Sequence, residues 1–379
     1  MLNFSELSYW EKIAVTESID FIVIGAGLVG VSTAISLRKN NPSAKIVVLE
    51  RGYLPTGAST KNAGFACFGS ATELVDDLSK MDENTVWETL ELRYKGLQEL
   101  LGVYGNEKIG YKCSGSWDLI HSKDKQIEEN TRNKINYLNQ RIFEITGEKN
   151  CFSEDQKSIF NNGFRNLSTT FHNRLEGEIR TDKLYHALQY KLAKNEIITL
   201  YGVEVKEITS SQNSITILTN FGELTSQKVA VTINGFANKL LGDQRVQPAR
   251  AQVLVTSPIQ KLKFSGTYHY EAGYYYFRTI NNRILIGGGR NLNIKGETTE
   301  EFGNTTQITS SIKELLKSVI IPETDFTIDY EWSGIMGVGN EKKPIIELIH
   351  PNLAIGIRMG GMGVAIGTLV GQKVAELLK

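Results

Sequence analysis

The chain has 379 residues, 41% of them hydrophobic, which is enough apolar material for two packed domains. Lys and Arg total 42, and so do Asp and Glu, so the formal net charge is zero and gives no support for nucleic acid as a partner. No run of about 18 apolar residues occurs, and the acidic and basic residues within positions 1–18 do not suit a signal peptide. We therefore expect neither membrane spanning nor secretion.

The cysteines also argue against secretion. Cys67, Cys113 and Cys151 form no C-x-x-C pair and have no histidine at metal-ligand spacing. The sequence therefore predicts no metal site and a reducing, cytoplasmic location.

The first predicted elements form a βαβ unit. Residues 20–24 are a short apolar run that ends at a glycine cluster, and residues 28–39 then repeat apolar residues at helical spacing. Residues 45–49 form a second β-branched run, closed by Glu50. This order predicts strand, tight turn, helix and a parallel second strand.

The turn of that unit fits G-x-G-x-x-G over residues 25–30. Gly25 permits the tight turn, Gly27 lets the backbone approach a pyrophosphate, and Gly30 lets helix and strand pack closely. The Glu50 carboxylate can accept both ribose hydroxyls and would repel a 2′-phosphate, which disfavours NADP. The alternative is a glycine-rich turn that binds no nucleotide. The cofactor-binding residues predicted here are Gly25, Ala26, Gly27, Leu28, Val29, Gly30, Glu50 and Arg51.

The middle of the chain alternates helices and strands. Residues 73–101 are rich in helix formers and predict helices that leave the nucleotide domain, and residues 182–194 predict another helix. A strand at 197–205 is followed by a hairpin with strands at 214–218 and 227–232. We expect this small meander to rejoin the first domain.

The last third predicts a second sheet and a return to the first domain. Residues 247–287 alternate β-branched and aromatic residues, which favours an antiparallel sheet. Residues 353–357 predict a strand and residues 362–378 a helix. We expect an α/β chain of two units. The first, discontinuous unit comprises 18–85, 150–240 and 335–379, and the second comprises 86–149 and 241–334.

A second segment decides between FAD and NAD. Residues 57–64 read Gly-Ala-Ser-Thr-Lys-Asn-Ala-Gly and follow Glu50 closely. Together with residues 25–50, this segment resembles the D-amino-acid-oxidase-like flavoproteins, which include glycine oxidase, sarcosine oxidase and γ-glutamylputrescine oxidase. An ordinary polar loop is the alternative. The resemblance implies a non-covalent FAD contacted by Ala58, Ser59, Thr60, Lys61, Asn62, Ala63, Gly64 and Phe65.

The resemblance extends over 177–188, 203–235 and 332–378. It implies a Rossmann-like FAD-binding domain of the glutathione-reductase type with a smaller antiparallel-sheet substrate domain. A glycine-rich segment between the last strand and the last helix would turn backbone amides toward flavin N1 and O2. A simple bend is the alternative there. Further FAD contacts implied are Val205, Asn234, Gly235, Arg358, Gly360, Gly361, Met362, Gly363 and Val364.

The resemblance also implies a reaction. Family members transfer a hydride from a carbon bearing nitrogen to flavin N5, yield an imine and usually pass the electrons to dioxygen. The expected partners are thus a small amine or amino acid and dioxygen, with hydrogen peroxide as product. The aromatic segment 268–278 is the expected lid over the ring, although tyrosines also serve ordinary sheet packing and a histidine can be purely structural. The catalytic candidates are Tyr268, His269, Tyr276 and Arg278.

One departure from the family concerns substrate choice. Met336 falls where amino-acid oxidases related to glycine oxidase carry an arginine that binds the substrate carboxylate, and a thioether cannot make that charge-assisted pair. Arg278, Arg290 or Arg358 would have to replace it, or the substrate is a polyamine-like or N-alkyl amine without that carboxylate. Cys67 has two readings, a thioether to the flavin or a small buried hydrophobe.

Other functions fit the same fold. One alternative is a 2-hydroxyacid or polyol dehydrogenase that passes electrons to a quinone or another carrier. A second is a flavin-binding protein without catalysis, and a third is the oxidase module of a tRNA-modifying enzyme, which the balanced charge does not support.

Overall fold

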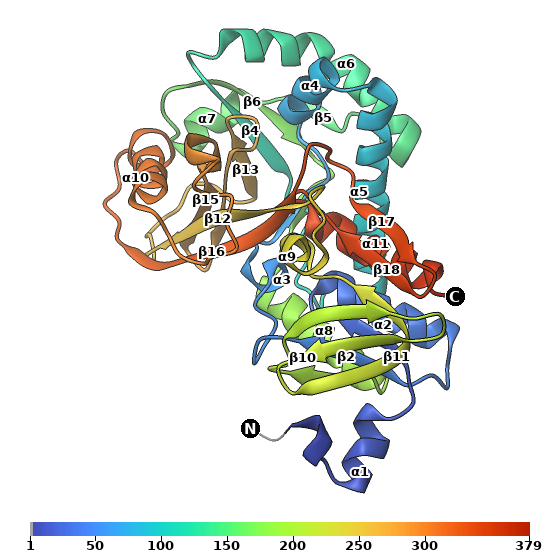
Figure 1. Cartoon of the computed structure of the whole chain (residues 1–379). Helices are drawn as coiled ribbons and strands as arrows, with labels where there is room; N and C mark the ends of the chain where they lie inside the picture. The colour runs from blue at the N-terminus through green and yellow to red at the C-terminus, as the bar shows by residue number, and fades with distance from the viewer. Residues whose placement is uncertain (1–2) are drawn as a thin grey trace.

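The computed structural model describes residues 3–379, which form two large β-sheets joined by helices (Figure 1). The first sheet contains the parallel strands predicted near the N-terminus, and the second carries the aromatic strands. The strands along the first sheet are β17 (Ile345–His350), β18 (Leu353–Ile357), β11 (Gly222–Val231), β1 (Ile19–Ile24), β2 (Ile46–Glu50) and β8 (Ile198–Tyr201). β10 (Ile215–Thr219) pairs with β11, and β9 (Val205–Ser210) pairs with β10.

The predicted βαβ unit is confirmed. β1 and β2 pair in parallel, with Phe21 opposite Ile46, and the helix α2 (Leu28–Asn40) connects them. All of β2 and nearly all of β1 are buried, which is why both strands read as continuous apolar runs. The unit thus places the glycine turn at the carboxyl end of β1, where open α/β sheets bind their ligands.

Different elements pack on the two faces of the first sheet. One face carries a core of α2, α8 (Thr181–Lys194) and α11 (Gly363–Leu377), and the other packs against the antiparallel ribbon of β9 and β10. Small residues let the helices approach closely: a methyl group added at Gly371 of α11 would lie 2.5 Å from the Val29 carbonyl oxygen of α2. The last helix therefore packs on the glycine-motif helix.

The second sheet is mixed rather than purely antiparallel. β13 pairs in parallel with β4, with Tyr268 opposite Trp117, while the neighbouring pairs are antiparallel. The predicted single aromatic strand is two strands, joined by a turn that includes Gly273. The strands in spatial order are β16 (Ile328–Val338), β12 (Gln247–Thr256), β15 (Arg283–Gly288), β14 (Tyr275–Ile280), β13 (Thr267–Tyr270), β4 (Ser116–His121), β6 (Leu167–Asn173) and β5 (Phe152–Glu154).

Two segments lie elsewhere than the predicted division places them. Residues 150–240 were expected in the first unit, but β5 and β6 pair with one another and β6 with β4, so both belong to the second sheet. Conversely, α5 (Glu83–Tyr104) packs on α11, because a methyl group added at Gly96 would lie 2.5 Å from the Ala365 carbonyl oxygen. Strand pairing decides the first placement, and helix packing between segments far apart in the sequence decides the second.

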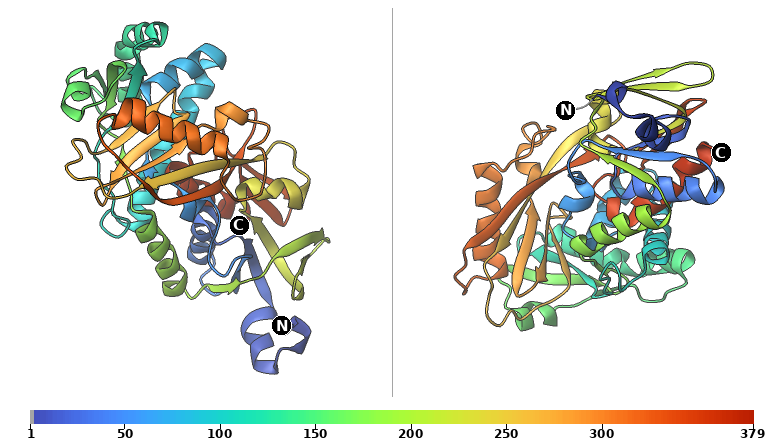
Figure 2. Two further views of the ribbon diagram at one scale, coloured as in Figure 1. Left: turned by 90° about the vertical axis from the view of Figure 1, so that its left-hand side faces the viewer. Right: turned by 90° about the horizontal axis from the view of Figure 1, so that it is seen from below.

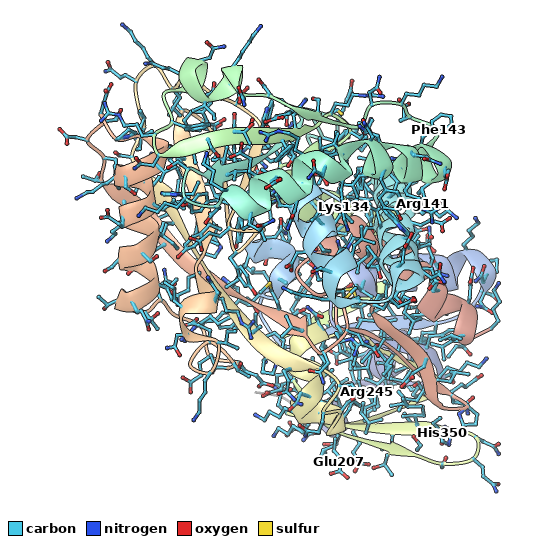
Figure 3. All side chains as sticks on the ribbon, turned by 90° about the horizontal axis from the view of Figure 1, so that it is seen from above. Lys134, Arg141, Phe143, Glu207, Arg245 and His350 are labelled. Carbon is cyan, nitrogen blue, oxygen red and sulfur yellow. The ribbon has the colours of Figure 1, made fainter. Side chains whose placement is uncertain are left out.

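Several elements were not predicted. A polar helix, α6 (Lys125–Thr146), lies on the outside of the molecule and carries Lys134, Arg141 and Phe143 (Figure 3). The short helices of residues 4–16 project beyond the first sheet (Figure 2). The remaining helices and strands are α3 (Ala58–Lys61), β3 (Phe65–Ala66), α4 (Ala71–Lys80), α7 (Lys157–Asn162), β7 (Gly177–Glu178), η3 (Asn234–Phe236), α9 (Ala237–Leu241), η4 (Arg290–Asn293), α10 (Thr306–Leu315) and η5 (Leu316–Ile320). Within residues 3–379, no helix is both long and apolar enough to cross a membrane.

Candidate cofactor and substrate site

A cavity of about 1150 Å³ lies between the two sheets. Its walls come from the ends of β1 and β2, from α3, from the last loop before α11, and from β12 to β16 of the second sheet. The predicted cofactor residues that line it are Gly25, Gly27, Leu28, Val29, Glu50, Arg51, Ala58, Ser59, Lys61, Asn62, Ala63, Phe65, Val205, Asn234, Gly360, Gly361, Met362, Gly363 and Val364.

The glycine turn presents backbone amides to this cavity. Gly25 has φ +103°, a conformation that side chains disfavour, and a methyl group added at Gly30 would clash with the Gly25 carbonyl oxygen. Gly27, the N-cap residue of α2, has no side chain with which to cap the helix. The Leu28 N–H donates a hydrogen bond to Ser59 Oγ at 2.8 Å. The start of α2 therefore offers polar donors and a position without a side chain, as a pyrophosphate requires.

Glu50 lies at the end of β2 on the wall of the same cavity. Its side chain accepts hydrogen bonds from Ala26 N–H at 3.1 Å and Gly52 N–H at 3.0 Å, while the residue is 7% exposed. Burial raises the pKa of the carboxyl, and these two hydrogen bonds oppose the rise. Each carboxylate oxygen retains lone pairs for a ribose hydroxyl. Nearby, the Arg51 guanidinium lies 3.8 Å from the centre of the Phe236 ring.

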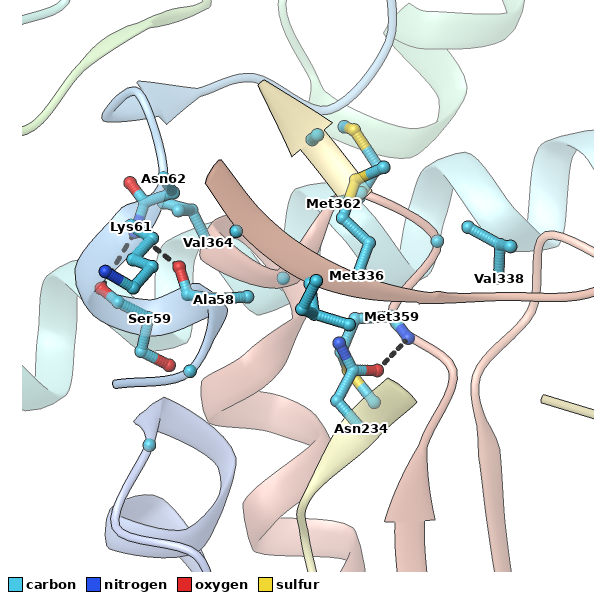
Figure 4. Close-up of a pocket in the computed structure, with 18 of the residues that line it drawn as sticks. Ala58, Ser59, Lys61, Asn62, Asn234, Met336, Val338, Met359, Met362 and Val364 are labelled. Atoms are coloured by element: carbon cyan, nitrogen blue, oxygen red, sulfur yellow. Dashed lines mark hydrogen bonds between the residues drawn. The ribbon is translucent and has the colours of Figure 1, made fainter. Parts of the chain in front are cut away.

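The segment after β2 is fixed by its own side chains and by both sheets. The Asn62 side chain donates to Ala58 O at 3.2 Å and Ser59 O at 2.8 Å (Figure 4). Its Oδ1 accepts from Gly64 N–H at 2.8 Å. From the second sheet, the Trp332 indole N–H donates to Lys61 O at 2.9 Å. The segment is thus held firmly beside the cavity before any ligand binds.

The loop before α11 forms the opposite wall. Arg358, Gly360 and Gly361 all have positive φ, and the Asn234 Oδ1 accepts from Met359 N–H at 3.0 Å (Figure 4). No side chain caps the start of α11, where Gly363 and other lining residues lie. The first amides of this helix are therefore available to stabilise negative charge on a bound group.

Six predicted cofactor residues do not line the cavity. Thr60 turns its hydroxyl to Pro55 O at 2.6 Å, and a methyl group at Gly235 would clash with Met336 O. Arg358 donates to Lys343 O and to the Glu341 carboxylate, both at 2.9 Å. The six residues support the cavity from behind: Ala26, Gly30, Thr60, Gly64, Gly235 and Arg358.

Tyr268 faces away from the cavity, in contrast to its predicted catalytic position. It is 1% exposed and stacks on Trp117 and Phe277, with ring centroids 5.2 and 4.8 Å away. Its hydroxyl donates to Ser265 O at 2.9 Å. Successive strand residues point to opposite faces, so His269 faces the cavity where Tyr268 faces the core.

Arg278 is also outside the cavity. Its guanidinium donates to Gly64 O at 3.0 Å and Ile179 O at 2.7 Å, and it lies 3.3 Å from the Glu178 carboxylate. Burial lowers the pKa of the guanidinium, and Glu178 opposes the decrease. Arg278 therefore fastens the segment next to the cavity and does not face a substrate, contrary to its predicted role.

His269 and Tyr276 do line the cavity, beside Phe65. The Phe65 ring centroid lies 5.3 Å from that of His269 and 5.5 Å from that of Tyr276. Behind His269, its Nδ1 is 3.2 Å from Ser116 Oγ and 3.7 Å from Asp118 Oδ1. This arrangement gives one titratable side chain at the wall and a buried carboxylate behind it.

Only one of the two oxygens of the Asp118 carboxylate has a hydrogen-bond partner among the described residues. Asp118 is 3% exposed, its Oδ2 accepts from Thr72 N–H at 3.0 Å, and its Oδ1 has no hydrogen-bond partner among the described residues. Burial raises the pKa of Asp118, and the nearby His269 opposes the rise. Asp118 thus places a buried carboxylate 3.7 Å from Nδ1 of His269.

A charged network at the cavity wall was not predicted. Glu73 of α4 contacts Arg93 of α5 at 3.2 Å and Lys342 at 2.8 Å, and Lys342 also contacts Asp77. Burial acts to raise the pKa of Glu73, but the two cations outweigh it and hold the pKa at about 2. These residues carry no motif, so only the packing of three distant segments reveals the network.

Comparison with known proteins identifies the family. The family described as FAD dependent oxidoreductase (DAO) matches residues 20–377. The chain is 20% identical to the probable oxidoreductase OrdL of Haemophilus influenzae over 96% of this chain and 83% of that protein.

Solved structures share the fold. Glycine oxidase from Geobacillus kaustophilus has a TM-score of 0.77 and 17% identity, covering 96% of this chain and 95% of its own. L-proline dehydrogenase from P. horikoshii has a TM-score of 0.75 and 19% identity, covering 96% and 94%. The glycine turn, Glu50 and the uncapped start of α11 fit FAD, and the chain belongs to the DAO family of FAD-dependent oxidoreductases.

Proposed function

We propose that this protein oxidises a carbon–nitrogen bond of a small amine or amino acid, with non-covalently bound FAD and with dioxygen as the electron acceptor. The observation that carries the proposal is that a single cavity contains both the dinucleotide-binding turn at Gly25 and the wall of Phe65, His269 and Tyr276. A substrate against that wall would lie beside the segment that the family uses to hold the flavin ring.

Bound FAD would supply the hydride acceptor, its N5 atom, and the products would be an imine and, after reoxidation, hydrogen peroxide. The chain's own residues hold the reactants. The start of α2 and Glu50 bind the dinucleotide end, and the amides at the start of α11 favour negative charge near Gly363. Phe65 and Tyr276 provide an apolar wall that excludes water from the reacting carbon.

His269 has the position required of a proton acceptor. An amine must lose its ammonium proton before its C–H bond can be oxidised, and His269 lines the cavity with Asp118 Oδ1 3.7 Å behind its Nδ1. A buried carboxylate in that place orients the imidazole and stabilises its protonated form. We assign His269 the role of accepting this proton and Asp118 that of positioning it.

Cys67 supports the non-covalent assignment, although it lines the cavity. Its thiol is buried, with Gly177 O at 3.7 Å and Thr267 Oγ1 at 3.8 Å. Burial, reinforced by Glu176, raises the pKa of this thiol well above its ordinary value. The reactive thiolate is therefore disfavoured at neutral pH.

The relatives also favour nitrogen compounds over hydroxy acids. The solved structures of similar fold include a glycine oxidase, an L-proline dehydrogenase and an iminodiacetate oxidase, whose names all refer to amino acids or amines. Their identity to this chain is below 20%, so they support the class of substrate and not a particular compound.

An anaerobic absorbance scan of the purified protein tests the proposal. Pools of amines, amino acids and 2-hydroxy acids are added in turn, and an amine or amino acid is expected to bleach the flavin bands, with hydrogen peroxide formed on readmission of air. Bleaching by hydroxy acids alone would instead indicate the dehydrogenase alternative. Protein that takes up no FAD, or flavin that no compound bleaches, would contradict the proposed oxidation.

A further inference from the structure

Arg290 lies on the same cavity wall as the residues of the proposed reaction. β13, β14 and β15 are neighbouring strands, and Tyr276 pairs with His269 on one side and with Gly287 on the other. The chain leaves β15 at Gly288, and Arg290 begins η4 directly afterwards. Gly288, Arg290 and Tyr276 all line the cavity.

The guanidinium of Arg290 has unused hydrogen-bond donors. Its Nε is buried and has no partner among the described residues, and its one hydrogen bond, from Nη2 to Thr298 Oγ1, is 3.5 Å long. Within residues 3–379, no carboxylate forms an ion pair with it. Glu297, which acts on it electrostatically, instead binds Arg250 at 2.8 Å.

The other arginines that line the cavity are already engaged, and so are Lys80 and Lys342. Arg93 and Lys342 share Glu73, and Lys80 pairs with Asp76 at 2.7 Å. Arg51 lies over the Phe236 ring at the dinucleotide end of the site. These contacts leave Arg290 as a planar donor whose charge and hydrogen-bonding capacity are not satisfied by the protein.

The other two arginines considered as anchors for a substrate carboxylate, Arg278 and Arg358, bind other groups of the protein. Arg278 donates from Nη1 to the carbonyl oxygens of Gly64 and Ile179, and its Nη2 pairs with Glu178. Arg358 donates to Lys343 O and to the Glu341 carboxylate. Neither guanidinium lines the cavity, and Met336, which does, offers only a thioether.

We propose that Arg290 binds the carboxylate of the substrate, which makes the substrate an amino acid and not a simple amine. This inference rests on the proposed function, because the carboxylate is placed relative to the amine that His269 would deprotonate. A half-buried guanidinium without partners is unfavourable, and a carboxylate would satisfy it with two parallel, charge-assisted hydrogen bonds. The oxidised carbon would then lie between this anchor and His269, along the wall formed by Tyr276.

Binding of non-oxidisable carboxylates tests the anchor without turnover. Acetate and benzoate are titrated into the FAD-loaded protein, each against its uncharged amide, and the visible flavin spectrum reports binding. The carboxylates are expected to bind more tightly than acetamide and benzamide. Arg290→Met is expected to weaken benzoate binding about 10- to 100-fold, with Arg290→Lys in between. Equal binding of benzoate and benzamide, or no spectral change with either carboxylate, would overturn the inference.

Arg283→Met is the matched control, because Arg283 begins β15, the strand that precedes Arg290, pairs with Asp329 at 2.5 Å and is outside the cavity. It should bind benzoate as the unmodified protein does. Benzoate binding to Arg290→Met as tight as to this control would also overturn the inference. If Arg290→Met does not fold, two other measurements test the inference. These are benzoate binding to Arg290→Lys and the comparison of benzoate with benzamide in the unmodified protein.

These experiments distinguish failure of the carboxylate anchor at Arg290 from failure of the proposed oxidation. If amines bleach the flavin but carboxylates do not bind, the anchor is wrong and the proposed oxidation stands. If benzoate binding depends on Arg290 but no nitrogen compound bleaches the flavin, the oxidation is wrong and the anion site stands. For an oxidised amino acid, Arg290→Met should raise KM far more than it lowers kcat.

Discussion

The Arg278 guanidinium donates a hydrogen bond to the Gly64 carbonyl oxygen at 3.0 Å, so β14 of the second sheet fastens the segment that follows the dinucleotide-binding unit. The same guanidinium also reaches Ile179 O at 2.7 Å. Neither partner is a side chain of the cavity. A residue predicted to touch the substrate is therefore a link between the two halves of the site.

Arg278→Met should destabilise the protein by about 3–5 kcal/mol, because it leaves the Glu178 carboxylate and two carbonyl oxygens without their buried donor. The free energy of unfolding in urea, measured without FAD, checks this. FAD should also bind more weakly, as the Gly64 segment loses its support. Arg283→Met, which breaks a more exposed ion pair, should cost at most about 1 kcal/mol. Equal stability of the two variants would contradict the role given to Arg278.

Gly27→Val should abolish FAD binding while the protein still folds. A Cβ at this position would already lie 2.9 Å from Ser59 Oγ, and the larger side chain would fill the space needed by the pyrophosphate. The ratio of flavin to protein after purification measures the effect. Gly102→Ala is a suitable control, since nothing lies within 4 Å of a Cβ there, and it should retain full flavin content. A fully loaded Gly27→Val protein would show that the cofactor lies elsewhere.

Glu73→Gln should lower the free energy of unfolding by about 3–5 kcal/mol at pH 7, because Arg93 is 4% exposed and would lose its carboxylate partner. The native pKa of Glu73, about 2, is below its unfolded value, so its stabilisation is present above that unfolded pKa. It is lost as the pH falls from about 4 toward about 2. The difference between the two proteins should therefore shrink over this pH range.

The exposed pair of Glu88 and Lys343 provides the control for that experiment. Glu88→Gln should change stability by at most about 1 kcal/mol at pH 7. A stability difference between Glu73→Gln and the unmodified protein that stays constant down to pH 2 would mean that the Glu73 charge does not stabilise the fold.

His269→Gln should reduce kcat/KM for an oxidised amine by about 10²- to 10⁴-fold near neutral pH, where the substrate is an ammonium ion. The loss should diminish as the pH approaches the pKa of the substrate, because a neutral amine no longer needs a proton acceptor. Asp118→Asn should show a smaller loss with the same pH trend, since Asp118 acts through His269. Steady-state kinetics between pH 6 and 10 measure both. A loss that is independent of pH would indicate a merely structural role.

The local parts of the fold were predictable from the sequence. The βαβ unit, the glycine turn and the final strand and helix each follow from a continuous pattern of a few residues, and the structure has all of them. The orientation of single side chains was not predictable. Whether Tyr268 or His269 faces the cavity depends on which side of the sheet meets the first domain, and alternation alone does not fix that choice.

Long-range contacts account for the other differences. Lys342 reaches Glu73 across 269 positions. The pairing of β6 with β4, and of β5 with β6, places both strands in the second sheet. Neither contact has a local signature, because each depends on how distant segments pack. Arg290 belongs to the same class, since only the folded chain shows that it lines the cavity, whereas Arg278 and Arg358 lie outside it and pair with Glu178 and Glu341.

The position of α11 has a consequence for how the protein is made. β1 and the glycine turn are synthesised early, but the helix that packs on α2 and completes the opposite wall, Gly363–Leu377, follows all the other helices and strands in the chain. A ribosome must synthesise residues 363–377 before these two helices can meet, although domains generally begin to fold from the N-terminus during synthesis. Flavin loading thus requires the synthesis of α11, and nascent chains stalled before Gly363 should carry no FAD.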